Sequence, residues 1–525
     1  MAVLLLVPMA IGVATVLTLW SGLYAQHLAE LGNSRLLTNN WHQAAATMKN
    51  VQPDYERKFA YYKVKPGQTV AEVAKSFGVT VHSLTKSNKG PITSGSVIKV
   101  MPVTAPLKPA RSTGTIGRAT IEKDGDLLRV INEFDANTPI VTTIPELARR
   151  LKQYDAIDAL GDKTYRLNRA ISIEGDIRVD ITGHTVTNLQ LTSTSKALAS
   201  LVFDESTVLI KGVRVSSVDP ATGEPDVDSS DGRSFVRMKN GRMDIIDSTI
   251  SRLGNGLTEN LSASAKISTA QGEGGTYGLS YRIDKGRLGS QITTGWVENS
   301  TFTHNHFGAY TFGASGMVWK NNRFTDNEVY GLDPHDDSNN ALIEGNLFEH
   351  NGKHGFIVSK RCNYNIIRGN WSLDNKLHGF MLHQDSAFNL IEDNVAADNV
   401  DNFVVYESNF NTIRNNRSHS PRSSHIRVNS AAHNTFVTGN RLYGGSRGVY
   451  LYDRVAATYV AANILRGVKE QIQTVDAKET FYGGNVAASI NYDITPGDTV
   501  IYGVNRVYRD ANEIPKLVSA NADLP

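Results

Sequence analysis

Asparagine recurs about every 24 residues in the second half of this chain, and this repeat limits the folds that are open to it. One series steps by 24, 24, 24, 22, 24 and 23 residues along Asn322, Asn346, Asn370, Asn394, Asn416, Asn440 and Asn463. A second series steps by 22, 24, 24 and 24 residues along Asn305, Asn327, Asn351, Asn375 and Asn399. Repeats this short that carry strands indicate a parallel β-helix, in which each repeat is one coil. Because asparagine tolerates left-handed turns and stacks its amides along such a ladder, we assign both series a structural role.

Alignment of the repeats predicts which side chains fill the interior. Two apolar columns follow from it: Leu332, Phe356, Phe380, Phe403, Ile426 and Val449, and then Pro334, Val358, Leu382, Val405, Val428 and Leu451. Since side chains alternate along a strand, the intervening Asp333, His335 and Asp337 should point outward. The same outward columns contain Tyr310, His383, Tyr406 and Arg427.

The stacking also predicts a neighbour for the acidic-histidine segment at 333–337. Coils lie about 4.8 Å apart, so Arg361 should lie one coil above Asp337 and diagonal to His335. Ten of the fourteen histidines fall between 304 and 433, which concentrates titratable groups in this region. We expect an elongated basic surface here, formed by these histidines together with Lys353, Lys360, Arg422 and the tyrosines. Such a surface suits an extended anionic polysaccharide.

Overall charge and cysteine usage exclude other classes. A net charge of +2 over 525 residues is too small for a nucleic-acid-binding protein. The chain has one cysteine, Cys362, so no intramolecular disulfide can form, and we expect a buried packing residue.

Three kinds of chemistry are considered for the segment Asp333-Pro334-His335-Asp336-Asp337. A calcium site would use the carboxylates, but histidine is a poor calcium ligand and Arg361 would oppose the cation. A transition-metal site would need further ligands, and His304 and His306 lie on an earlier coil. We therefore expect no metal and no other cofactor.

The third chemistry is removal of a proton from a carbon next to a carboxylate. His335, neutral near pH 7, can accept the proton, and Arg361 can neutralise the carboxylate whose charge grows as the carbanion forms. Asp333 or Asp336 could hold the imidazole in the required tautomer. A polysaccharide lyase shares this first step, and Tyr310 or Tyr406 could then protonate its leaving oxygen. A non-catalytic scaffold that only grips polymer is the third alternative.

The Asp333–Asp336 tetrad, followed by Lys353-His354-Gly355 and Arg361, resembles the periplasmic mannuronan C5-epimerase family of alginate biosynthesis. The resemblance covers roughly residues 160–510. It implies a right-handed parallel β-helix that converts β-D-mannuronate to α-L-guluronate within the polymer. It further implies that His335 is the base, that Arg361 neutralises the carboxylate and that His354 lies in the groove. Water would protonate the opposite face, and calcium would not be needed for the chemistry.

The N-terminal region predicts export and a second carbohydrate-binding part. Residues 2–20 carry no charge and as a helix would rise about 28 Å, close to one bilayer core. We expect an uncleaved anchor or a cleaved signal over residues 1–24, and a spacer over 25–60. The protein would then act in the periplasm, either anchored in the inner membrane or released there.

Residues 61–103 resemble the LysM module. A strand at Tyr62, a Pro66-Gly67 turn, a helix capped by Thr69, a second helix from Val81 and a closing strand at 97–100 follow its order of elements. The resemblance implies binding of peptidoglycan, and exopolysaccharide secretion proteins are further expected partners.

A linker and N-terminal cap should follow over 104–160, with a helix from Ile144 to about Tyr154. Residues 253–292 read as an insertion without an assigned role, and 511–525 as a C-terminal tail.

Overall fold

The computed structural model describes most of the chain from residue 60 onward. The described residues are 60–64, 66–76, 81, 84–85, 88, 90–100, 103–111, 114–132, 140–194, 198–230, 232–255, 277–283, 292–487, 492–494, 500–502 and 506–507. The predicted anchor and tail lie outside these ranges, as does nearly all of the predicted spacer. Within the described ranges, no helix is long and apolar enough to cross a membrane.

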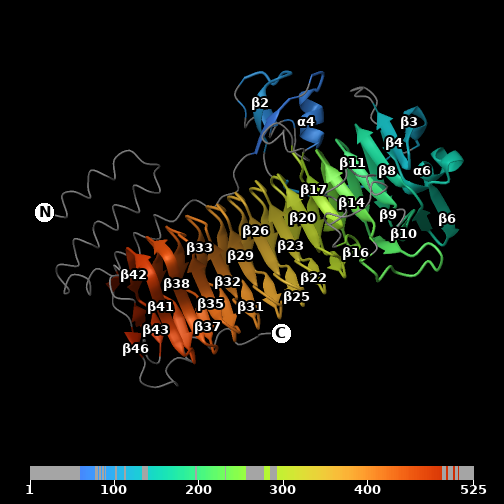
Figure 1. Cartoon of the computed structure of the whole chain (residues 1–525). Helices are drawn as coiled ribbons and strands as arrows, with labels where there is room; N and C mark the ends of the chain where they lie inside the picture. Colours follow the sequence, from blue (N-terminus) through green and yellow to red (C-terminus); the bar gives the residue numbers. More distant parts are fainter. Residues whose placement is uncertain are drawn as a thin grey trace. The chain divides into compact units, whose positions relative to one another are not determined.

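The chain divides into two compact units, which meet in sequence between Gly379 and Phe380. In each unit, short parallel strands stack coil upon coil into three sheets, as Figure 1 shows for the green-to-orange part of the chain. The predicted parallel β-helix is therefore confirmed. We describe the strands of the N-terminal unit (residues 57–379) first, because it holds the tetrad.

One sheet of the N-terminal unit, here called the site sheet, contains the tetrad strand. Its parallel strands are β4 (Leu127–Asn132), β8 (Ala170–Gly175), β11 (Ser200–Asp204), β14 (Phe235–Lys239), β17 (Leu279–Arg282), β20 (Ala309–Phe312), β23 (Leu332–His335) and β26 (Phe356–Ser359). The second sheet contains β5 (Ile140–Thr142), β9 (Ile177–Thr182), β12 (Thr207–Lys211), β15 (Arg242–Ile246), β18 (Trp296–Glu298), β21 (Val318–Lys320), β24 (Leu342–Glu344) and β27 (Ile366–Arg368). The third contains β7 (Thr164–Leu167), β10 (Asn188–Thr192), β13 (Arg214–Val218), β16 (Thr249–Ser251), β19 (Thr301–Thr303), β22 (Arg323–Thr325), β25 (Leu347–Glu349) and β28 (Trp371–Leu373).

The C-terminal unit, from Phe380 onward, repeats the three-sheet plan. Its first sheet contains β29 (Phe380–His383), β32 (Phe403–Tyr406), β35 (Ser424–Asn429), β38 (Arg447–Ala456), β41 (Glu470–Lys478) and β44 (Tyr492–Ile494). The second contains β30 (Leu390–Glu392), β33 (Thr412–Arg414), β36 (Phe436–Thr438), β39 (Tyr459–Ala461), β42 (Thr480–Gly483) and β45 (Val500–Tyr502). The third contains β31 (Val395–Ala397), β34 (Arg417–His419), β37 (Arg441–Tyr443), β40 (Ile464–Arg466), β43 (Val486–Ala487) and β46 (Arg506–Val507).

The predicted register of the coils is confirmed. Leu332 pairs with Phe356, and His335 pairs with Phe312 on one side and Ser359 on the other. Leu332 and Phe356 are fully buried, as an interior column requires. In the C-terminal unit, the predicted column Phe380, Phe403, Ile426 and Val449 is likewise in register and buried.

Both asparagine series are buried in the coils, and their stacked amides confirm the predicted structural role. The Asn322 side-chain amide donates to Asn346 Oδ1 at 2.9 Å, and Asn346 donates to Asn370 at the same distance. Each amide also donates to a main-chain carbonyl, as Asn322 does to Val297 at 3.0 Å. The left-handed backbone falls one residue earlier, for example at Asn321 (φ 52°) and Gly345 (φ 67°), so the expectation that the ladder asparagines adopt it is wrong.

An N-terminal cap closes the first coil. Strand β3 (Thr120–Asp124) pairs antiparallel with β4, and β6 (Ile157–Gly161) pairs antiparallel with β7. The cap also contains the 3₁₀ turn η2 (Ile116–Arg118) before β3, and α6 (Ile144–Arg150) followed by the 3₁₀ turn η3 (Lys152–Tyr154) before β6. The predicted helix from Ile144 is confirmed, but its last turn is a separate 3₁₀ turn after Leu151.

The LysM-like segment forms the predicted strand–helix framework. Its elements are β1 (Ala60–Lys63), α4 (Val70–Ser76) and β2 (Val97–Val100), and β1 pairs antiparallel with β2. Thr69 caps α4, since its hydroxyl accepts the Glu72 amide at 3.3 Å. The Asn88 side chain fastens β2 by accepting from Lys99 N at 2.7 Å and donating to Lys99 O at 2.8 Å.

The segment predicted to be a linker is bound along the β-helix. Leu107 N donates to Asp244 Oδ2 at 2.7 Å, and Arg242 donates to Ala105 O at 2.7 Å. Two coils earlier, the Asp180 carboxylate accepts the Ala110 amide at 2.5 Å. Residues 103–111 therefore form a strap held by an Arg-x-Asp pair on each of two strands, β15 and β9.

Candidate active site

The tetrad ends a strand of the site sheet and begins a corner. His335 is the last residue of β23, and Asp336 (φ 32°) and Asp337 (φ 60°) turn the chain through left-handed backbone. The next coil repeats this corner with Lys360 (φ 64°) and Arg361 (φ 62°). The corners stack, because Asp336 N donates to Ser359 O at 2.8 Å and Asp337 N donates to Lys360 O at 3.0 Å. Two acidic residues thus lie directly below two basic ones.

The imidazole of His335 is oriented by its neighbour. His335 Nδ1 lies 2.5 Å from Asp336 Oδ2. A carboxylate at Nδ1 fixes the tautomer that carries its proton there, which leaves Nε2 with a lone pair. Burial lowers the pKa of His335 below its usual range, against the opposing effect of Asp336. The imidazole is therefore a neutral base, and 21% of the surface of the His335 side chain is exposed.

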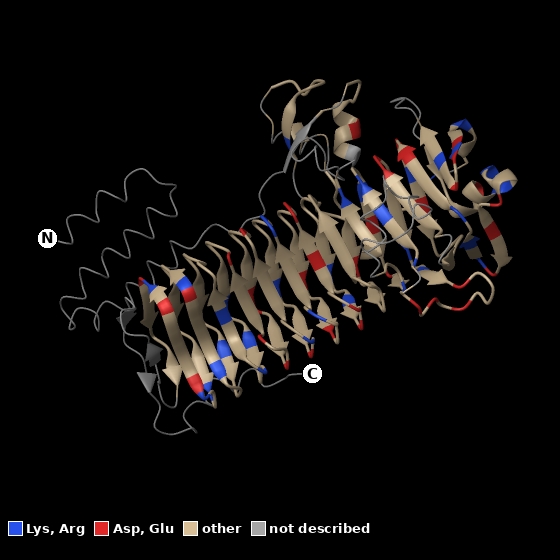
Figure 2. Cartoon of the chain, in the orientation of Figure 1, with Lys and Arg blue, Asp and Glu red and all other residues tan. Residues whose placement is uncertain are grey.

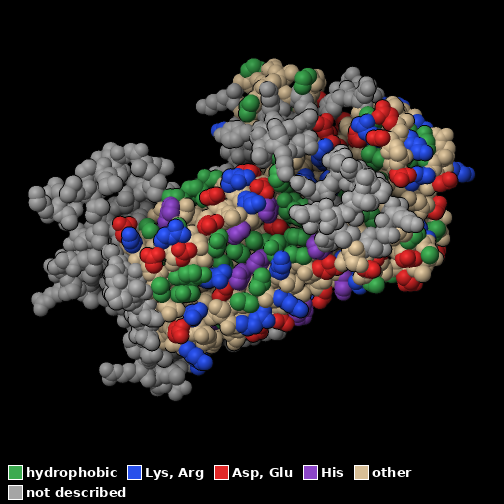
Figure 3. Space-filling view, in the orientation of Figure 1, with side chains coloured by type: hydrophobic (Ala, Val, Ile, Leu, Met, Phe, Trp, Pro, Cys, Tyr) green, Lys and Arg blue, Asp and Glu red, His purple; other side chains and the backbone are tan. Residues whose placement is uncertain are grey.

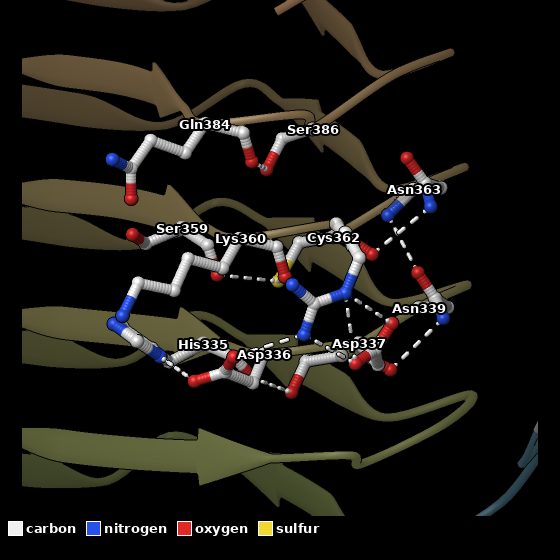
Figure 4. Close-up of polar contacts among 12 residues, drawn as sticks. His335, Asp336, Asp337, Asn339, Ser359, Lys360, Cys362, Asn363, Gln384 and Ser386 are labelled. Carbon is white, nitrogen blue, oxygen red and sulfur yellow. Dashed lines mark hydrogen bonds and ion pairs between the residues drawn. The ribbon is translucent and has the colours of Figure 1, made fainter. Parts of the chain in front are cut away.

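Arg361 occupies the place that the repeat predicts, and two of its three nitrogens contact carboxylates. Its Nη2 lies 3.0 Å from Asp336 Oδ1 and 2.9 Å from Asp337 Oδ2, and its Nε donates to Asp337 Oδ1 at 3.1 Å. The hydrogen bonds that Arg361 donates to Asp337 raise the pKa of Arg361, so the guanidinium is always charged. Two carboxylates, those of Asp336 and Asp337, lie within ion-pair distance of its positive charge; both are labelled in Figure 4.

Lys360 approaches His335 from the coil above. Figure 4 shows its side chain reaching back so that its amino group lies beside the His335 ring. Its charge contributes to the lowered pKa of His335. The sequence places this lysine only on a general basic surface, because a strand pattern does not show that residue 360 sits in a corner.

Asp333 is buried, which corrects the prediction that it faces solvent. It is 2% exposed, and its Oδ1 has no hydrogen-bond partner among the residues described. Burial raises the pKa of Asp333 well above its usual range and so favours the uncharged form of its carboxyl group. It stands between Tyr310 below and Ile357 above in the stack, and both of these are also buried. The alternation of side chains along the strand predicts that Asp333 lies on the outer face of the sheet, but large neighbouring side chains cover that face here.

Tyrosines form the cover on this side of the site. Tyr310 is 3% exposed, and its ring lies 5.6 Å from the ring of His335. Tyr277 stacks on Tyr310 at 3.6 Å between ring centroids, nearly parallel at 8°. Burial keeps the pKa of Tyr310 far above its usual range, so its hydroxyl stays protonated. Tyr277 comes from the insertion at 253–292, and no repeat predicts where an insertion packs.

His354 lies in a stack of rings and is not open to a groove. It is 6% exposed, 4.9 Å from the ring of Tyr330 and 4.9 Å from that of His378. Its Nδ1 accepts the His378 amide at 3.3 Å. The resemblance implies that His354 lies in the groove; in this structure it is buried, since neighbouring coils bring aromatic rings over both its faces.

Three predicted residues fall in the C-terminal unit. His383 and Tyr406 are neighbours in register, with ring centroids 5.1 Å apart, and both are partly exposed. Arg427 Nη1 lies 3.0 Å from Asp401 Oδ2, and Asp401 is fully buried. Arg427 is thus an ion-pair partner within its own unit, which a column of outward positions does not reveal.

The histidines on the earlier coil belong to a different cluster. His306 Nδ1 lies 2.8 Å from Glu328 Oε2, and Glu328 also pairs with the fully buried Arg233. In the described part of the chain, no group of three or more His, Cys, Asp or Glu side chains converges as a metal site would require. Cys362 is buried, as predicted.

Charge and side-chain type vary along the surface. Figure 2 shows basic and acidic residues interspersed along the strands and corners, in keeping with the small net charge. On the face seen in Figure 3, histidine and basic side chains lie among apolar ones. Acidic side chains lie on the same face, so it combines apolar patches with charges of both signs.

Comparisons with known proteins agree with this architecture. Three family models match: "Right handed beta helix region" over 234–396, "Periplasmic copper-binding protein (NosD)" over 334–498 and "LysM domain" over 62–100. The crystal structure of the periplasmic alginate epimerase AlgG superposes with a TM-score of 0.55 at 20% identity, covering 73% of this chain and 84% of that one. A mutant of the same enzyme gives 0.57 over the same shares.

Curated relatives match over a short stretch. The mannuronan C5-epimerase of Pseudomonas putida is 40% identical over 60 residues, which is 11% of this chain and 12% of the relative. The mannuronan C5-epimerase AlgG of Azotobacter vinelandii is also 40% identical over 60 residues, 11% of each chain. The aligned stretch thus spans only about a tenth of these relatives.

The fold is therefore a right-handed parallel β-helix that follows a LysM domain in the chain, as predicted. The predicted resemblance to mannuronan C5-epimerases is confirmed as well, because the curated relatives carry that name.

Proposed function

We propose that this protein is an isomerase that converts β-D-mannuronate to α-L-guluronate within a polymer. The single observation that carries the proposal is the His335–Asp336 contact of 2.5 Å, which presents a neutral imidazole at the edge of a β-helix surface. The names of the curated relatives and the AlgG-like fold support the substrate class.

In the proposed reaction, His335 Nε2 removes the proton at C5, and the electron pair of the broken C–H bond moves into the adjacent carboxylate. A nearby cation stabilises the charge that develops there. Water returns a proton to C5 from the opposite face, and His335 releases its proton to solvent. Asp336 holds the tautomer and stabilises the imidazolium that forms in between.

The setting of the reaction is part of the proposal. Export to the periplasm, with an N-terminal anchor or a cleaved signal, follows from residues 1–24 and from the periplasmic location that the AlgG and NosD descriptions print. The LysM domain would bind peptidoglycan, and secretion proteins for exopolysaccharide would be partners.

A proton NMR experiment on the full chain tests the proposal against the lyase. Polymannuronate is incubated with the protein, and guluronate signals are expected with the chain length unchanged. Unsaturated chain ends would identify a lyase instead, and an unchanged polymer would identify a non-catalytic binding protein.

A further inference from the structure

The third sheet of the C-terminal unit carries a row of arginines on its outer face. Ser418, Leu442 and Leu465 are buried at the centres of β34, β37 and β40, so the residues on either side of them point outward. Five of these outward residues, here called the arginine patch, are three arginines, a histidine and a tyrosine, each partly or fully exposed: Arg417, His419, Arg441, Tyr443 and Arg466.

The register of the coils brings the arginine patch together. Arg417 is directly opposite Arg441 on the neighbouring coil. His419 is opposite Tyr443, and Tyr443 is opposite Arg466 on the coil after that. The rings of His419 and Tyr443 stack, with their centroids 4.8 Å apart. Burial raises the pKa of Tyr443, and the charges of all three arginines oppose this effect, so the three guanidinium groups surround one ring.

The pairing of two arginines in this sheet is unfavourable by itself. Like charges directly opposite each other on neighbouring strands destabilise a sheet. On the second sheet of the same unit, Arg414 is opposite Glu392 and forms an ion pair with it at 2.7 Å. Arg417 instead faces Arg441, and neither Arg441 nor Arg466 makes an ion pair or a side-chain hydrogen bond within the described part of the chain. A ligand with negative charges would remove this repulsion.

The local charge is strongly positive. Burial and the charge of Arg417 lower the pKa of His419, against the opposing effect of Asp398, so the imidazole is neutral near pH 7. The three arginines of the patch and this one acid carry a formal charge of +2, as much as the whole 525-residue chain. Figure 2 shows basic residues gathered around the strand that Figure 1 labels β37. The patch is therefore a local concentration of charge and not a general property of the surface.

The arrangement fits a linear polymer of uronates. Coils lie about 4.8 Å apart, so the guanidinium groups form a row along the stack that suits an anion with repeated charges. A guanidinium can bind a carboxylate through two parallel hydrogen bonds, and a polyuronate carries a carboxylate on every sugar. The Tyr443 hydroxyl, which burial keeps protonated, can donate to sugar oxygens.

We propose that the arginine patch is a second binding site for the polyuronate, on a different sheet from His383, Tyr406 and Arg427 of the same unit. The site holds a stretch of polymer that is not undergoing reaction. The choice of a polyuronate rests on the proposed function. A nucleic acid also carries regular negative charges and is the control ligand in the test below.

Binding to the full chain tests the proposal without any need for turnover. The Arg441→Gln and Arg466→Gln variants are titrated with polymannuronate and with its carboxyl-reduced, uncharged counterpart. Lys478→Gln is the matched control, because Lys478 is exposed on the first sheet of the same unit and its loss changes the net charge equally. Each patch variant should weaken binding of the charged polymer by about threefold or more, with no change for the uncharged polymer or for the control.

Arg441→Glu gives a sharper test, because binding and stability should change in opposite directions. The substitution places a carboxylate opposite Arg417, as Glu392 is opposite Arg414. Repulsion then becomes attraction, so the Tm should rise by about 1 to 3 °C. Binding of polymannuronate should fall by about tenfold or more, because one positive charge of the site is replaced by a negative one. Weaker binding by a more stable protein cannot result from misfolding.

Two outcomes would overturn the proposal. The first is equal polymannuronate binding by Arg441→Gln, Arg441→Glu and the unchanged chain. The second is a loss of single-stranded DNA binding in these variants as large as the loss for polymannuronate, since it would identify a general anion-binding surface.

A proton NMR assay of turnover separates the arginine patch from the proposed function. Arg441→Glu should keep its kcat at saturating polymer and raise KM by about the factor by which binding is weakened. Selective loss of polymannuronate binding in Arg441→Glu, in a protein that forms no guluronate, would support the patch and refute the epimerase. Guluronate formed by Arg441→Glu with an unchanged KM would support the epimerase and overturn the patch.

Discussion

His335 Nδ1 lies 2.5 Å from Asp336 Oδ2, and the same Asp336 carboxylate receives Arg361 Nη2 at 3.0 Å through its other oxygen. The base, its orienting carboxylate and the cation that fixes that carboxylate therefore form one connected chain across two coils. The two corners stack, because each contributes two residues with left-handed backbone at the same position in its coil. This stacking brings the three side chains together.

Asp336→Asn should lower kcat by roughly 10² to 10⁴, because an amide favours the wrong tautomer of the imidazole. Asp336 raises the pKa of His335, so its neutralisation should move the acid limb of the kcat profile to lower pH. A pH–rate series measures both effects. An acid limb that stays in place would show that Asp336 does not act on the imidazole.

Asp333→Asn should retain most of the activity, because burial favours the uncharged form of the carboxyl group, which the amide resembles in size and charge. The raised pKa also makes a prediction for stability. In the unfolded chain the carboxyl ionises above its ordinary pKa of about 3.9, so the native state loses stability as pH rises from there toward the raised native value.

The asparagine variant lacks this loss. The Tm of Asp333→Asn should equal that of the unchanged protein near pH 3 and exceed it increasingly toward neutral pH. Thermal unfolding followed by circular dichroism across this range measures the difference. An equal Tm at pH 7 would mean that Asp333 is ionised in the native state, contrary to its burial.

Asn346→Ala should destabilise the N-terminal unit by about 2 kcal/mol or more, because it breaks the amide ladder. Asn346 accepts from Asn322 and donates to Asn370 and to Trp319 O, so its loss leaves several buried groups unsatisfied. Chemical denaturation measures the cost, with the exposed Asn321→Gly as the control. Equal losses in both variants would show that the ladder contributes nothing specific.

Asp244→Ala should release the strap. Asp244 is fully buried, pairs with Arg242 and accepts Leu107 N, so the substitution leaves a buried guanidinium without its carboxylate. Such losses cost about 3 to 5 kcal/mol. Limited proteolysis should then cut within 103–111, whereas Glu224→Ala, on an exposed turn, should leave the segment resistant. Resistance in Asp244→Ala would mean that other contacts hold the strap.

Much of the fold follows from the sequence because its interactions are periodic. The asparagine ladders and the apolar columns repeat every 22 to 24 residues, so the spacing alone predicts the register of Leu332 with Phe356. The proximity of Arg361 to Asp337 follows from the same period. Local capping patterns predicted α6 and the LysM elements for similar reasons.

The repeat does not predict which side chains on the outside of the coils are buried, because burial depends on the groups that cover them. Alternation gives the outer face for Asp333 and the resemblance places His354 in the groove, but both are buried, and for His354 the covering rings come from Tyr330 and His378. The place of Lys360 depends on where β26 ends, and the stacking of Tyr277 depends on an insertion. Neither has a periodic pattern in the sequence.

The most direct measurement of the central claim is solvent deuterium incorporation at C5. Polymannuronate is incubated in deuterated water with the full chain and with its His335→Gln variant, and the products are followed by proton NMR. The account predicts guluronate that carries deuterium at C5 with the unchanged chain, and none with His335→Gln. Guluronate formed at an equal rate by His335→Gln would contradict the account.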